Sequence, residues 1–141
     1  MANPANSTAY RGGDGRLYVN VTEAKTLGAA DSGYVQNVIA SVTCTLPATA
    51  TQGVWTIRNG GTQASSSIGY GSGADGLLIS VDPNGSDTIA GFDVATSAAD
   101  GKQLNNTATT ARVGDEVTII NSGATDGPLL VEMKGVWARE A

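Results

Sequence analysis

The chain has 141 residues and a formal net charge of −5, a size that suits one domain with a single core. Eight Lys and Arg stand against 13 Asp and Glu, so DNA and RNA are poor partners, because binding them requires an excess of basic residues. Histidine is absent and Cys44 is the single cysteine, which excludes internal disulfides, Cys/His zinc sites and histidine-dependent triads. Only 15% of the residues are charged and 19 are Gly, so we expect a weakly charged surface.

The first 16 residues differ from the rest of the chain. They lack apolar periodicity, and positions 12–15 read Gly-Gly-Asp-Gly, which predicts a flexible N-terminal arm over 1–16 and a β-rich domain over 17–141. The opening residues have neither the basic nor the apolar region of a secretory signal, so we expect no export by the Sec route. No apolar run approaches the roughly 20 residues that cross a bilayer, so we expect no membrane partner.

Alternation of apolar and polar residues predicts about eight strands along the chain. In the last of them, one face of the predicted strand carries Leu129, Val131 and Met133, and the other carries Leu130, Glu132 and Lys134. Between the strands we expect one helical turn at 23–30, a long loop at 62–76 and a polar connection around 105–107. This spacing predicts an all-β fold: a β-sandwich or jelly roll, or a small closed barrel of the β-tulip type. The predicted strands are 17–22, 34–38, 42–46, 54–58, 77–81, 88–90, 116–120 and 129–137.

Several polar patterns have an ordinary structural interpretation. Residues 82–87 carry oxygen atoms at alternate positions, as a calcium loop does, but a Pro-Asn-Gly turn explains them without a metal. The glycines at 69, 71 and 73 neither precede a helix nor carry the Lys of a phosphate-binding loop. Most carboxylates lie in predicted turns, and the sequence does not bring two of them to the separation that a glycosidase needs. We therefore predict no cofactor and no metal.

The candidate nucleophiles and large aromatic residues also have competing interpretations. Cys44 shares its strand face with aliphatic residues, which predicts core packing and not a reactive thiolate. The run Ser65–Ser67 has no histidine base in the chain and is interpreted as linker. Trp55 and Trp137 each anchor either the core or an interface. A sugar-binding platform is a further alternative, and its candidate tyrosines are Tyr10, Tyr18, Tyr34 and Tyr70.

The order of short motifs along the chain resembles the capsid decoration, or cement, proteins of tailed bacteriophages. The resemblance runs from about residue 17 to the C-terminus, and each motif is a strand followed by its turn. The motifs are AADSGYVQNV at 29–38, TLPA at 45–48, WTIRNGG at 55–61, ISVDPN at 79–84, SDTIAG at 86–91, KQLNNT at 102–107, RVGDEVT at 112–118 and GVWARE at 135–140.

The resemblance implies a structural virion protein that is made in the host cytoplasm and binds the outer surface of the capsid. Its expected partners are the major capsid protein and two further copies of itself in a homotrimer, which bridges capsid subunits and stabilises the head. No catalysis is implied. We expect the arm, through Tyr10, Arg11 and Arg16, to contact the capsid, and Trp137 to lie in the interface between protomers.

Fibre and spike domains of phages share such strand-turn patterns. The alternative hypothesis is therefore a domain that recognises a host glycan or cell surface. An exposed aromatic cluster that included Tyr70 or Trp55 would favour it.

Overall fold

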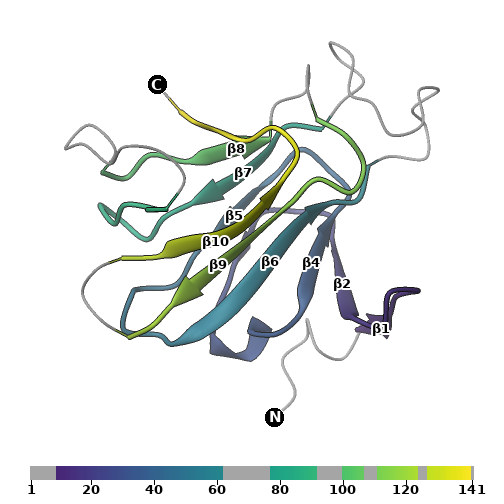
Figure 1. Cartoon of the computed structure of the whole chain (residues 1–141), viewed down its shortest axis with the longest axis horizontal. Coiled ribbons are helices and arrows are strands. Elements are labelled where there is room, and N and C mark those ends of the chain that lie inside the picture. Colours follow the sequence, from purple (N-terminus) through teal and green to yellow (C-terminus); the bar gives the residue numbers. More distant parts are fainter. Residues whose placement is uncertain (1–8, 62–76, 92–99, 107–110, 124–126, 141) are drawn as a thin grey trace.

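The computed structural model describes residues 9–61, 77–91, 100–106, 111–123 and 127–140. Within them the chain forms short strands and a single 3-10 turn, η1 (Figure 1). The elements are β1 (Tyr10–Arg11), β2 (Leu17–Val21), β3 (Lys25–Thr26), η1 (Ala29–Asp31), β4 (Val35–Val38), β5 (Thr43–Thr45), β6 (Gly53–Asn59), β7 (Ile79–Asp82), β8 (Leu104–Asn106), β9 (Glu116–Asn121), β10 (Leu129–Lys134) and β11 (Ala138–Arg139).

The strands make two sheets that pack face to face. The first has six strands in the order β1-β2-β4-β6-β9-β10, and the second has five in the order β11-β8-β7-β5-β3. Figure 1 shows the six-stranded sheet sweeping from β10 across to β2, with β5, β7 and β8 in the second layer. The predicted all-β sandwich is confirmed, and the two separate sheets exclude the closed barrel that was its alternative.

The first half of the chain winds between the two sheets. Strands β2, β4 and β6 lie in one sheet and pair in parallel, while β3, β5 and β7 lie in the other and also pair in parallel. Parallel neighbours need a crossover connection, and here each crossover contains a strand of the opposite sheet. The later strands β8, β9, β10 and β11 add to this framework in antiparallel fashion.

The inner faces of the two sheets form one continuous apolar core. Trp55 of β6 is fully buried in it, and its indole Nε1 donates to the carbonyl oxygen of Gly28 at 3.0 Å. Ile57 and Cys44 are likewise inaccessible to solvent, so the predicted core position of Cys44 is confirmed. The other core side chains are Val21, Leu27, Val38, Leu46, Leu77, Ile79, Val81, Ile89, Leu104, Val117, Ile119, Leu130 and Trp137.

A buried polar cluster joins the sheets at one end of the sandwich. The Asn106 side chain on β8 accepts from Asn59 Nδ2 at 2.8 Å, and its own Nδ2 donates to Asp115 Oδ2 and to the carbonyl oxygen of Val136, each at 3.0 Å. Asp115 Oδ2 also accepts from the Arg112 backbone N–H at 2.9 Å. These bonds satisfy side chains that are otherwise costly to bury, and they fix β6 against β8.

Three local predictions require correction. Residues 10–11 of the predicted arm form β1, which pairs with β2 through a turn closed by the Gly12 N–H to Arg16 C=O bond of 2.8 Å. Residues 9–16 are therefore folded onto the sheet, and residues 1–8 lie outside the described part. The predicted helical turn at 23–30 is β3 followed by η1, and the polar connection at 105–107 includes strand β8. The predicted loop at 62–76 lies outside the described residues.

A β-bulge in β10 overturns the predicted alternation of the last strand. Leu130 lies opposite Ile119, but Glu132 lies opposite Thr118, so Val131 is an extra residue. A bulge shifts the side-chain phase of the strand, and Met133 consequently lies opposite Val117, whose side chain points inward. Leu129, Val131 and Met133 therefore do not share one face, and each is nearly half exposed.

In the ranges that the structure describes, no helix has the length and apolar character needed to cross a bilayer.

Candidate functional site

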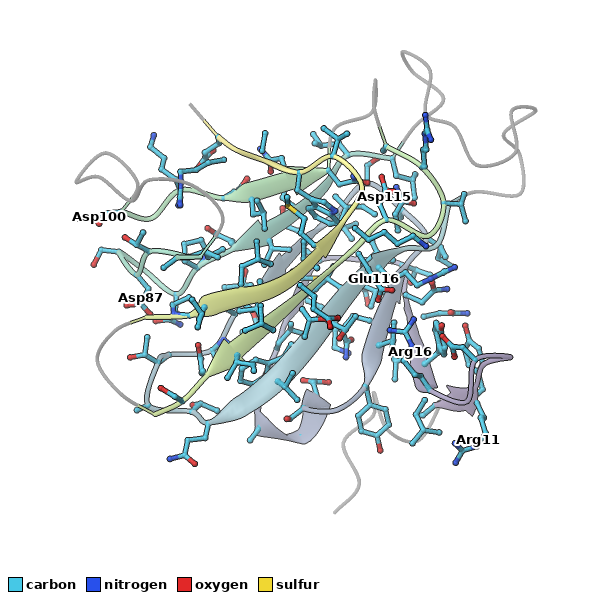
Figure 2. The ribbon with its side chains drawn as sticks, in the orientation of Figure 1. Arg11, Arg16, Asp87, Asp100, Asp115 and Glu116 are labelled. Atoms are coloured by element: carbon cyan, nitrogen blue, oxygen red, sulfur yellow. The ribbon has the colours of Figure 1, made fainter. Side chains whose placement is uncertain are left out.

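The side of the six-stranded sheet that points away from the core, here called the outer face, carries most of the charged and aromatic contacts. Asp14, Arg16 and Glu116 form a linked ion-pair cluster there. Arg16 Nε donates to Asp14 Oδ2 at 2.8 Å, while its Nη1 and Nη2 donate to the two Glu116 oxygens at 2.8 and 3.3 Å. Figure 2 shows Arg16 beside the hairpin of β1 and β2, with Glu116 close to it over the sheet. These contacts tie the hairpin to β9.

Tyr18 of β2 is the residue on which the aromatic and cationic contacts of the outer face converge. Its ring stacks on that of Tyr10 with centroids 5.7 Å apart, and the guanidinium groups of Arg16 and Arg58 lie 5.6 and 5.8 Å from its centroid. Its hydroxyl donates to Asp14 Oδ2 at 2.6 Å. Burial first, and this bond to a carboxylate second, raise the pKa of Tyr18. Hydrogen bonds from Tyr18 and then from Arg16 hold the pKa of Asp14 well below its ordinary value.

A polar row crosses five strands of the outer face in register. Its members are Asn20, Asn37, Arg58, Glu116 and Lys134, one each from β2, β4, β6, β9 and β10. Arg58 Nη1 donates to Asn37 Oδ1 at 2.8 Å, and Asn37 Nδ2 donates to Asn20 Oδ1 at 3.1 Å. The row is thus a connected ladder on its β2 side.

The β10 side of the polar row holds two cations without a carboxylate partner. Glu116 is engaged by Arg16, and no ion pair within the described residues includes Arg58 or Lys134. Both cations flank Gly114: a methyl group placed on that glycine would lie 3.8 Å from Arg58 Nη2 and 3.8 Å from Lys134 Nζ. The two nitrogens therefore lie on the same side of Gly114, each close to the position of its missing side chain.

A second row, which is apolar, crosses the outer face at the opposite end of β6, β9 and β10. Val54 of β6, Ile120 of β9 and Leu129 of β10 lie in register and are 36, 37 and 47% exposed. Between the two rows, Thr56 and Thr118 join their hydroxyls at 3.0 Å. The outer face of β6, β9 and β10 therefore has an apolar end and a cationic end.

The predicted site residues divide between surface and core. Tyr10 and Arg11 lie on β1, both exposed, where Tyr10 donates to Asn20 and Arg11 to the Gly15 carbonyl oxygen. Arg16 lies near them in the ion-pair cluster. Trp137 is only 6% exposed and donates to the Lys134 carbonyl oxygen at 3.0 Å. Its ring is therefore covered by the core of its own chain, and its place in an interface between protomers stays a prediction.

The other candidate sites have structural explanations where the structure describes them. Burial raises the pKa of the Cys44 thiol to about 11, so its predicted core role is confirmed. The Asp82–Asp87 segment makes a turn, closed by the Asp87 N–H to Asn84 C=O bond of 3.0 Å. No group of three Cys, Asp or Glu side chains in the described ranges is arranged to hold a metal ion. The Ser65–Ser67 run and Tyr70 lie outside those ranges.

The sequence reasoning missed the polar and apolar rows. Their members are single residues on five separate strands, and only the strand order brings them together. No protein-family model matches the chain, and no curated protein matches it. The outer face combines charge, hydrogen-bonding groups and exposed aliphatic surface, which is the chemistry of protein recognition.

Proposed function

We propose that the chain is a structural virion protein that binds the outer surface of a phage capsid and stabilises the head by bridging capsid subunits as a homotrimer. Its partners are the major capsid protein and other copies of itself, without nucleic acid or membrane, and it is made in the host cytoplasm. The sequence resemblance suggests this role. The observation that carries it is the exposed apolar row Val54, Ile120 and Leu129 on the outer face of the six-stranded sheet.

The exposed row supports binding to another protein. Aliphatic side chains that stay exposed to water on the outer face of a sheet are energetically unfavourable. A partner surface that covers them contributes about 25 cal/mol of stabilisation per Å² of apolar surface buried. Aliphatic and aromatic groups surrounded by polar ones are typical of the centre of protein interfaces. The role proposed here is binding and not catalysis.

The proposal is tested by mixing the purified protein with expanded empty heads of the phage that encodes it and sedimenting the heads. We expect the protein to sediment with the heads at a fixed, saturable ratio to the major capsid protein. Bovine serum albumin at equal concentration controls for trapping. If the protein stays in the supernatant at micromolar concentrations, the proposed function is wrong.

The arm's part in attachment is tested by removing residues 1–8 alone, because this deletion leaves β1, Asp14 and Arg16 in place. We expect the shortened protein to unfold at the same temperature as the full chain and to bind heads more weakly, because residues 1–8 belong to the predicted capsid-binding arm, of which Tyr10, Arg11 and Arg16 remain. Equal binding by the two forms would assign the capsid contact to the folded domain.

A second candidate is a fibre or spike domain that recognises a host glycan. The exposed ring of Tyr10, 42% accessible beside Asn20 and Arg16, favours it, because sugars stack on aromatic rings. Trp55, however, is fully buried, and Tyr18 is 8% exposed beneath Tyr10. Binding to a glycan array that is lost in Tyr10→Ala would support this candidate over capsid decoration.

A further inference from the structure

We infer that the outer face of β6, β9 and β10 docks an extended segment of the major capsid protein that presents an aliphatic side chain and a carboxylate about 13 Å apart. This inference rests on the proposed function and names the partner chemistry of the same face. It follows from the two rows: Val54 and Arg58 are four residues apart on β6 and point to the same side.

The cationic end specifies the carboxylate. Arg58 Nη1 is held by Asn37, and the ring of Tyr18 lies beneath the guanidinium, so Arg58 Nη2 is fixed on the side of Gly114. Lys134 Nζ lies at the same distance from that glycine. A side chain on residue 114 would fill part of the space between them. Gly114 is buried and has φ of +98°, a conformation that glycine adopts readily, so no side chain from this position separates the two cations.

Charge complementarity favours an acidic group there. Arg16 already neutralises Glu116, the carboxylate that lies between Arg58 and Lys134 in the row. A carboxylate from a partner would offset the charge of Arg58 and Lys134, and it would accept charge-assisted hydrogen bonds from both cations.

The apolar end favours a protein segment over a glycan. Val54, Ile120 and Leu129 present aliphatic groups, and no aromatic ring belongs to this row. Carbohydrates bind with aromatic platforms and dense hydrogen bonding, whereas an aliphatic row accommodates Leu, Ile or Val of a partner chain. An extended segment with the two anchors four residues apart matches the rise of about 3.3 Å per residue.

Two substitutions test the two ends, each with a matched control on the five-stranded side. Lys134→Glu reverses a charge at the cationic end, and Lys102→Glu makes the same change just before β8. Leu129→Asp places a charge in the apolar row, and Leu78→Asp does so at a leucine just before β7 with nearly equal exposure, 45 against 47%. Thermal unfolding of each variant shows whether it is folded before binding to expanded heads is measured.

We expect Lys134→Glu and Leu129→Asp each to weaken binding to heads by about tenfold or more, and the two controls to leave it within about twofold. Raising the salt concentration should weaken wild-type binding and narrow its difference from Lys134→Glu. If folded Lys134→Glu and Leu129→Asp bind heads like the wild type, the inference is wrong while the proposed function stands.

Failure of the wild type itself to bind heads would overturn the proposed function and with it the capsid partner. Binding of the wild type to a sialylated glycan that is lost in Lys134→Glu would reassign the cation pair to sugar recognition and would also overturn the inference. The glycan measurement uses immobilised sialyllactose with lactose as the uncharged control.

Discussion

Burial raises the pKa of the Cys44 thiol to about 11, and the side chain is inaccessible on β5 between the two sheets. Because the thiolate is the reactive form, we expect a disulfide reagent at pH 8 to label native protein only as fast as the protein unfolds. Labelling in denaturant gives the reference rate for one free thiol. Rapid labelling of the native protein would show that the thiol is accessible and contradict its place in the core.

Tyr18 and Asp14 make a second residue-level prediction. The pKa of Tyr18 is raised above 10 by burial and by its bond to Asp14, so the native phenol remains protonated where the unfolded one ionises. Its contribution to stability is present below pH 10 and is lost as the pH rises through the higher native value. We expect Asp14→Asn to lower the pKa of Tyr18, measured by ultraviolet titration against a Tyr18→Phe reference. An unchanged titration curve would remove Asp14 as a cause.

Two neighbouring asparagines on β8 differ in their hydrogen bonds, and we expect their removal to change stability by different amounts. Asn106 is fully buried and makes three hydrogen bonds that join the sheets, whereas Asn105 Oδ1 has no partner. We expect Asn106→Ala to lower the free energy of unfolding by about 3 kcal/mol, because its buried partners are left unsatisfied. Asn105→Ala, the matched control, should cost less than about 1 kcal/mol. Equal losses in urea unfolding would contradict the role of the buried cluster.

The elements that could be predicted are those with strong local alternation. Strands β6 and β9 alternate cleanly between core and surface, whereas the sequence left Trp55 between the core and an interface. Strand β8 was missed because the side chain of Asn106 is satisfied by Asp115 and Asn59, long-range partners that local propensity does not contain. The bulge at Val131 was missed for a related reason: one extra residue changes the phase of β10, and only its register with β9 reveals it.

At the scale of the whole molecule, the β-sandwich could be predicted from strand spacing and turn residues, but its winding could not. Parallel pairing of β2 with β4 and of β4 with β6 joins residues separated by crossovers through the other sheet. The polar row depends on that order, because Asn20, Asn37 and Arg58 become neighbours only when the three strands lie side by side. The charge pattern of this row therefore could not be predicted from the sequence.

We also predict that the protein forms a homotrimer in solution. We expect light scattering at micromolar concentration to give a mass near three times the 14.2 kDa of one chain. We expect Leu129→Asp and its control Leu78→Asp to leave this mass unchanged, because the apolar row is assigned to the capsid and Leu78 to neither contact. A lower mass for either variant would place that residue between copies. A wild-type mass of one chain would contradict a trimer that is stable before attachment.

The central claim is that attachment stabilises the head, and the temperature at which filled heads release their DNA tests it most directly. Heads lacking the protein are compared with the same heads saturated with it, and release is followed with a DNA-binding dye. We predict that decorated heads retain DNA to a higher temperature, because bridges between capsid subunits oppose their separation. Release at the same temperature from heads that demonstrably carry the protein would contradict the claim.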